Sequence, residues 1–117
     1  MLEDKLTQNK AGILKAMAHP TRINILESLR TGERCVCEII ELVDTEQSNT
    51  SQHLSQLKKM GIISSRKDGL KVIYKVNNSE IFSLLDLLDR IIAGQMEESK
   101  ALLEDLKKRR VDGQLSL

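Results

Sequence analysis

The chain has 117 residues, the length of one domain, because most domains contain about 100 to 150 residues. Hydrophobic residues make up 40% of it and charged residues 30%, which excludes a disordered chain of high net charge. Aromatic residues make up only 2%. This excludes proteins that bind single-stranded nucleic acid by stacking bases on aromatic side chains.

The sequence shows no targeting segment and no apolar run long enough to span a bilayer. We therefore expect a cytoplasmic protein with no membrane partner. In a reducing compartment its two cysteines are expected to be thiols, metal ligands or redox sensors rather than a structural disulfide.

Apolar residues recur at helical spacing from Leu2 to Met17. This first helix should end at the His19-Pro20 step, because the residue before proline is driven out of the helical region. Pro20 or Thr21 then opens a second helix, which runs to a break at residues 31–33. A short third helix carries Cys37 and the apolar residues up to Val43, and ends in the polar stretch 44–47.

A fourth helix is predicted from Ser48 to Met60, closed by Gly61 as a left-handed cap. Its start could equally be capped by Thr45. Leu54, Leu57 and Met60 lie on one side, and serine, asparagine, glutamine, histidine and lysine on the other.

Two strand-like runs, 62–67 and 70–76, flank Asp68-Gly69, which is a strong signal for a β-hairpin. Alternation in the second run predicts a core side and a mostly basic side. The expected core side is Leu70, Val72, Tyr74 and Val76, and the basic side is Lys71, Ile73 and Lys75.

Asn78-Ser79 is expected to cap the last helix, whose broad apolar face begins at Ile81. The apolar pattern resumes after Gly94, so one helix and two helices broken at this glycine both remain open. We expect a single domain over residues 1–110, followed by a frayed tail at 111–117.

These elements predict a mainly α fold with a small β-hairpin, the winged helix-turn-helix. The fourth helix would enter the major groove of double-stranded DNA and the hairpin would lie on the adjacent backbone. Residues 50–75 carry six basic residues against one acid, which suits a polyanionic partner. The expected DNA-binding residues are Gln47, Ser48, Asn49, Ser51, Gln52, His53, Lys67 and Lys71.

Two members of the fourth helix have alternative interpretations. Thr50 could point inward rather than toward DNA. His53 could be a surface or half-packed histidine, and a metal-ligand role is disfavoured because no second histidine is expected nearby.

Four stretches resemble the ArsR/SmtB family of winged-helix transcriptional repressors, which sense metals, metalloids or redox agents. They are LKAMAHPTRINILESL, ERCVCEI, QSNTSQHLSQLKKMGII and RKDGLKVIYKV. The resemblance implies a homodimer paired through the first and last helices, an operator with two half-sites, and repression relieved by an inducer.

In arsenite- and cadmium-sensing members that this chain resembles, a Cys-Val-Cys at the start of the third helix binds the inducer. Here it is Cys35-Val36-Cys37. Residues i and i+2 of a helix point about 200° apart, so both sulfurs can face one ion only if Cys35 lies at the helix start or the helix unwinds. Thiolates suit a thiophilic metal or metalloid ion.

Family arsenite sites usually take a third thiol, and the nearby position is Ile40 here. The partner's cysteines, a small-molecule thiol, or oxidation of the cysteine pair could complete the chemistry, so ion sensing and thiol oxidation both remain open. The family's other site, on the last helix, is disfavoured because no histidine follows His53. The cysteines could also be small buried hydrophobes.

Other function classes are weaker. A thiol oxidoreductase needs a base near its nucleophile, and neither histidine is beside the cysteines in sequence, so we expect no enzyme. A metal carrier of the same fold and a helical protein-interaction module are the remaining alternatives.

Overall fold

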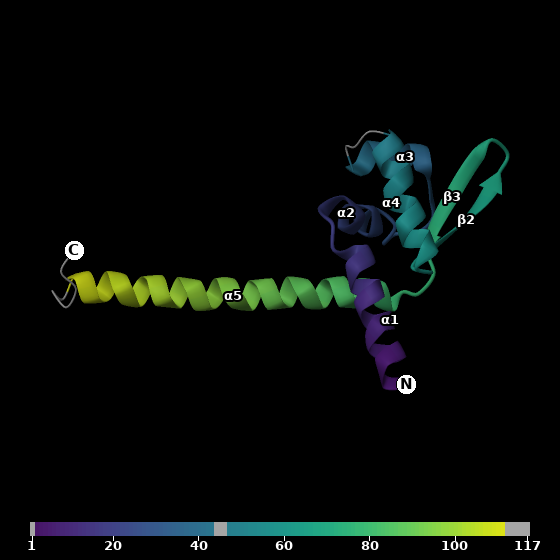
Figure 1. Ribbon diagram of the computed structural model, residues 1–117. Helices are drawn as coiled ribbons and strands as arrows, with labels where there is room; N and C mark the ends of the chain where they lie inside the picture. The colour runs from purple at the N-terminus through teal and green to yellow at the C-terminus, as the bar shows by residue number, and fades with distance from the viewer. Residues whose placement is uncertain (1, 44–46, 112–117) are drawn as a thin grey trace. The chain divides into compact units, whose positions relative to one another are not determined.

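The computed structural model describes residues 2–43 and 47–111 (Figure 1), with residues 2, 3, 47, 48 and 111 described by their backbone alone. The chain divides into two units, Met1–Phe82 and Ser83–Leu117. The predicted fold class is confirmed: the first unit is a set of helices with a small antiparallel sheet. The elements are α1 (Leu2–Met17), α2 (Pro20–Ser28), β1 (Arg34–Cys35), α3 (Val36–Val43), α4 (Gln47–Lys59), β2 (Ile63–Asp68), β3 (Lys71–Val76) and α5 (Glu80–Val111).

The break between α1 and α2 lies at the predicted His19-Pro20 step. His19 has an extended backbone and its Nδ1 accepts the backbone N–H of Thr21 at 3.1 Å, which makes it the N-cap of α2. Pro20 follows at the first helical position, where its missing N–H costs no hydrogen bond. Helix α2 ends at Ser28, a few residues before the predicted break.

The core of the first unit contains buried side chains from α1, α2, α3 and α4 and from the strands β1 and β2. Helix α2 contacts both α3 and α4, and α4 also contacts β2. The largest fully buried side chains are Ile25, Leu26, Cys35, Ile39, Thr50, Leu54, Leu57 and Ile63. The inward alternative for Thr50 is therefore confirmed, and Leu54 and Leu57 lie in the core as predicted, whereas Met60 is 39% exposed.

Helix α4 ends at Lys59, and the predicted left-handed cap is Gly61, whose φ of 75° glycine adopts without a steric penalty. The N–H of Gly61 donates to the carbonyl of Lys58, and the N–H of Ile62 donates to the carbonyl of Leu57 at 3.1 Å. This pair of bonds is a Schellman motif. It turns the chain from α4 directly into β2. The proposed Thr45 cap at the other end of α4 lies outside the described residues.

The sheet contains one strand that the sequence analysis did not predict. In the described residues the order is β1-β3-β2, and all neighbours are antiparallel. Two residues of β1 pair with β3, Arg34 opposite Tyr74 and Cys35 opposite Ile73. A two-residue strand has no alternation to recognise, so only its tertiary partner defines it.

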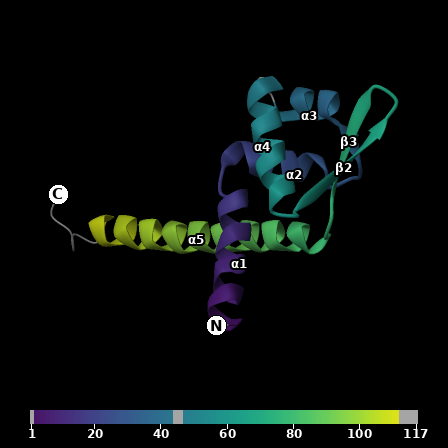
Figure 2. The same ribbon diagram turned by 45° about the vertical axis from the view of Figure 1, so that its right-hand side comes forward.

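The hairpin of β2 and β3 extends away from the helices of the first unit (Figure 2). Asp68 pairs with Lys71, so the loop residues are Gly69 and Leu70, one position beyond the prediction. Gly69 takes φ 63° at the first loop position, and Leu70 is fully exposed. Its predicted place on the core side is wrong, because the loop turns it into solvent.

Helix α5 is continuous through Gly94, which resolves the open question in favour of one helix. The side-chain oxygen of Asn78 accepts the N–H of Glu80 at 2.9 Å and caps its start, as predicted. No helix in the described part of the chain has the length and apolar character needed to cross a membrane. The predicted frayed tail beyond residue 111 lies outside the described residues.

Candidate nucleic-acid interface and dithiol site

Helix α4 separates buried and exposed residues as the sequence predicts. Asn49, Ser51 and Gln52 are exposed, while Thr50 and Leu54 are buried. Gln47 and Ser48 form the first turn of α4, but their side chains lie outside the described part. Three uncharged hydrogen-bonding side chains therefore stand outward near the N-terminal end of α4, where major-groove readers place their base-contacting residues.

His53 is half-buried and has neighbours that its position in the sequence did not suggest. Its ring centroid lies 4.4 Å from that of His19, so the interpretation that no second histidine is nearby is wrong. The Nε of Arg22 donates to His53 Nδ1 at 3.0 Å. Burial, and then the charges of His19 and Arg22, lower the pKa of His53.

The hairpin presents Lys67 and Lys71 on its exposed surface. Neither has an ion-pair partner among the described residues, so both charges are available to a polyanion. Arg66 differs, because its guanidinium lies 2.7 Å from the carboxylate of Glu33 and ties the hairpin to the loop before β1.

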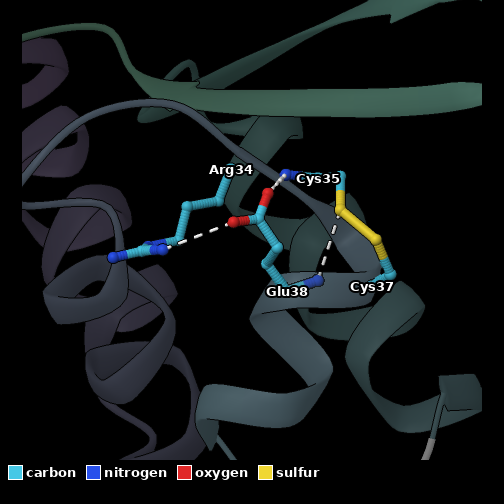
Figure 3. The surroundings of a disulfide bond; sticks show 4 residues. All are labelled: Arg34, Cys35, Cys37 and Glu38. Carbon is cyan, nitrogen blue, oxygen red and sulfur yellow. Dashed lines mark hydrogen bonds and ion pairs between the residues drawn. A yellow bond between two sulfur atoms is a disulfide. The ribbon is translucent and has the colours of Figure 1, made fainter.

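The two cysteines lie at the junction between β1 and α3 (Figure 3). Cys35 ends β1 and is buried, whereas Cys37 lies in the first turn of α3 and is exposed. Their Cα atoms are 5.3 Å apart and a disulfide joins them. The disulfide differs from the expected free thiols or metal ligands and is compatible with the expected redox sensor. Because Cys35 precedes the helix, the 200° separation of a regular helix does not apply, and the two sulfurs can meet.

Cys35 and Glu38 form a reciprocal cap at the start of α3. The sulfur of Cys35 accepts the backbone N–H of Glu38 at 3.3 Å, and the Glu38 carboxylate accepts the N–H of Cys35 at 3.1 Å. Arg34 lies 3.5 Å from the other oxygen of this carboxylate (Figure 3). The arrangement is a capping box with sulfur in place of a hydroxyl oxygen. It makes the sulfur of Cys35 part of the helix terminus.

The described residues contain no group of three or more histidine, cysteine, aspartate or glutamate side chains placed to hold a metal ion. One chain thus offers a soft ion two sulfurs. The described residues supply no third side chain of these types to an ion held by the two sulfurs.

Arg22 and Glu38 are two functional candidates that were not predicted from the sequence. Arg22 contacts a residue 31 positions away, and nothing in its own helix indicates that partner. Glu38 could have been found, because Cys-x-x-Glu before an apolar run has the spacing of a Ser-x-x-Glu capping box.

Comparison with known proteins gives a consistent result. Residues 19–65 match the family described as bacterial regulatory protein, arsR family. The chain is 37% identical over 108 residues to the uncharacterised HTH-type transcriptional regulator Rv0081 of Mycobacterium tuberculosis, covering 92% of this chain and 95% of that protein. The crystal structure of Rv0081 superimposes with a TM-score of 0.73 at 36% identity, covering 80% and 95% of the two chains.

Two further similarities concern ligands and assembly. The cadmium resistance transcriptional regulatory protein CadC of Listeria innocua is 37% identical over 82 residues, 69% of each chain. A solution structure of the homodimeric winged helix-turn-helix DNA-binding domain Mb0332 from Mycobacterium bovis has a TM-score of 0.73 at 26% identity, covering 82% of this chain and 89% of that one.

Proposed function

Because the chain belongs to the ArsR family of bacterial regulatory proteins, we propose that it is a homodimeric repressor whose affinity for DNA is switched through Cys35 and Cys37. Membership makes it a DNA-binding transcriptional regulator with a winged helix-turn-helix, and not an enzyme. A bacterial DNA-binding regulator would act in the cytoplasm, where the chromosome lies. The single observation that carries the switch is the position of Cys35, which belongs at once to the sheet of the wing and to the cap of α3.

The DNA contacts would come from two elements of the first unit. Helix α4 would present Gln47, Ser48, Asn49, Ser51, Gln52 and His53 to the major groove, and the hairpin would place Lys67 and Lys71 on the phosphate backbone. The exposure of Asn49, Ser51 and Gln52 supports the first assignment, and that of both lysines supports the second.

The homodimer would form through α1 and α5 and bind an operator with two half-sites. Both helices expose large apolar side chains, among them Leu6 and Leu14 of α1 and Ile91 and Met96 of α5, each more than half exposed. The homodimeric state of Mb0332 supports the assembly. Substituting Ile91 by Glu should produce monomers in sedimentation equilibrium, whereas Ala93→Glu, which adds the same charge about 160° further around the helix, should not.

A chemical change at the sulfur of Cys35 would affect both elements assigned to DNA, α4 and the hairpin. Its sulfur accepts the N–H of Glu38, so a change of bonding at sulfur changes the cap of α3, the helix that precedes α4. Its backbone pairs with Ile73 of β3, so the same displacement is passed to the wing. A ligand or oxidant shifts DNA affinity when it favours one arrangement of these contacts over the other.

Oxidation is the chemistry that the site supports best. Two thiols lose two protons and two electrons to form the disulfide, and hydrogen peroxide takes up these protons and electrons and becomes two molecules of water. The pair requires no third ligand for this reaction, and the exposed sulfur of Cys37 is accessible to the oxidant.

A thiophilic metal or metalloid ion is the second candidate. The similarity to CadC, named for cadmium resistance, favours it, and the two sulfurs are soft donors directed to one place. Cys35 and Cys37 would hold the ion, with remaining ligands from the second protomer or a small-molecule thiol. Binding would replace the sulfur cap of α3 by a bond to the ion.

The test is binding of anaerobic, reduced protein to the DNA upstream of its own coding sequence, with hydrogen peroxide, arsenite or cadmium added in separate samples. We expect peroxide to lower the affinity and a thiol reductant to restore it. The Cys35→Ser, Cys37→Ser double variant should bind DNA and ignore every agent. A response to arsenite or cadmium in the presence of the reductant would instead establish ion sensing. Equal responses of the wild type and the double variant would show that the cysteines do not control DNA affinity.

A further inference from the structure

Arg22 of α2 and His53 of α4 line an open hollow on the outer surface of α4. The volume is about 490 Å³, and the remaining lining comes from four residues of α4. The full lining is Arg22, Ser51, Gln52, His53, Ser55 and Gln56. Two of them, Ser51 and Gln52, are among the exposed residues already assigned to DNA, so the hollow is continuous with the candidate interface.

The bond from Arg22 fixes the hydrogen-bonding character of His53. Because Arg22 Nε can only donate, His53 Nδ1 must accept, and a neutral ring then carries its proton on Nε2. No described residue accepts a hydrogen bond from Nε2. His53 therefore offers one N–H donor to a ligand.

Arg22 is itself held in place. Its Nη1 donates to the carbonyl of Ala16 at 3.2 Å while its Nε donates to His53. The guanidinium keeps its charge in all conditions, so it brings a fixed positive charge to the edge of the hollow. The lining side chains can all donate hydrogen bonds, and none is a carboxylate. This composition suits an anion with several acceptor oxygens.

We propose that the hollow binds a phosphate of the DNA backbone, with His53 Nε2–H and the guanidinium of Arg22 as its donors. The proposal rests on the DNA-binding function and adds a phosphate site on the recognition helix itself, apart from the wing. A phosphate here would fix the register of α4 in the groove without reading sequence. Arg22 both contacts the phosphate and holds His53 in the tautomer that donates to it.

The test compares His53→Phe, which keeps a ring but has no N–H, with Arg22→Gln, which removes the charge. Both should lose affinity about tenfold, and equally on the upstream DNA and on an unrelated duplex of the same length. The slope of log affinity against log salt should fall by about 1 for Arg22→Gln and stay unchanged for His53→Phe, because a neutral histidine releases no counterion. His53→Gln, whose amide can donate, should recover most of the loss, and Asn24→Ala on α2 outside the hollow should bind like wild type.

A second measurement locates the phosphate. Replacing single phosphates by uncharged methylphosphonates should weaken wild-type binding at a defined position in each half-site, and the loss at that position should be smaller in His53→Phe, which keeps only the Arg22 donor. Losses confined to the upstream DNA would assign His53 to base reading and overturn the proposal. The proposal would also be overturned if the wild type binds DNA and both variants bind it with the same affinity. Wild-type protein that binds no duplex would instead contradict the DNA-binding function itself. Thermal unfolding of each variant excludes loss of fold as the cause.

Discussion

Cys35 and Glu38 cap each other: the sulfur accepts the Glu38 N–H at 3.3 Å and the carboxylate accepts the Cys35 N–H at 3.1 Å. The start of α3 thus depends on an atom that can also be oxidised or bind an ion. A serine oxygen at position 35 can accept the same N–H as the sulfur but lacks the thiol chemistry. Cys35→Ser therefore tests the cap separately from oxidation or ion binding.

With a reductant present, Cys35→Ala should lower the free energy of unfolding by about 1 kcal/mol relative to Cys35→Ser, because only serine keeps a cap acceptor. Urea titration followed by circular dichroism measures the difference. Cys37→Ala is the control at an exposed position and should change the stability little. Equal stability of the Ala and Ser variants would show that the sulfur contact contributes nothing to the cap.

The sequence predicted those parts of the fold that depend on local chemistry. Pro20 sets the start of α2, Gly61 the end of α4, and the apolar spacing the inward face of α4. It could not predict the pairing of β1 with β3 or the bond between Arg22 and His53, because each joins residues more than 30 positions apart. Leu70 shows the limit within a local motif, since moving the turn by one residue reversed its burial.

Leu57 of α4 is fully buried. Leu57→Ala should therefore lower the free energy of unfolding by about 2 to 5 kcal/mol, and Leu54→Ala by a similar amount, because each leaves a cavity. Leu70→Ala is the matched control, as the same substitution at a fully exposed leucine should stay within about 0.5 kcal/mol. Chemical denaturation measures these changes in the free energy of unfolding. A small effect at Leu57 would mean that α4 packs by a different face.

Gln52 is exposed on α4 and is expected to contact a base edge. Gln52→Ala should weaken binding to the specific site by about 1 to 3 kcal/mol and leave binding to an unrelated duplex nearly unchanged. Fluorescence anisotropy with both duplexes measures the ratio, and thermal unfolding verifies the fold. If the two affinities fall together, Gln52 does not read sequence.

Lys67 and Lys71 stand exposed on the wing. Substituting either by Ala should weaken binding to all duplexes alike and lower the salt slope by about 1, because one fewer counterion is released. Lys100→Ala on α5, also at an exposed position, removes the same charge outside the wing and should leave the slope unchanged. An unaltered slope in both wing variants would argue that the hairpin does not touch the backbone.

The stability of the fold should depend on pH through His53. Burial, then the charges of His19 and Arg22, lower its pKa, so the unfolded chain takes up a proton at a higher pH than the folded chain does. Between the ordinary histidine pKa of about 6.5 and the lowered folded value, the unfolded state binds more protons, and stability falls as the pH falls. Above the unfolded value the contribution is fully present, and it is lost as the pH passes down through the folded value. Urea titrations from pH 8 to pH 5 should show a steeper decline for the wild type than for His53→Gln, which cannot titrate; parallel curves would place the pH-sensitive contact elsewhere.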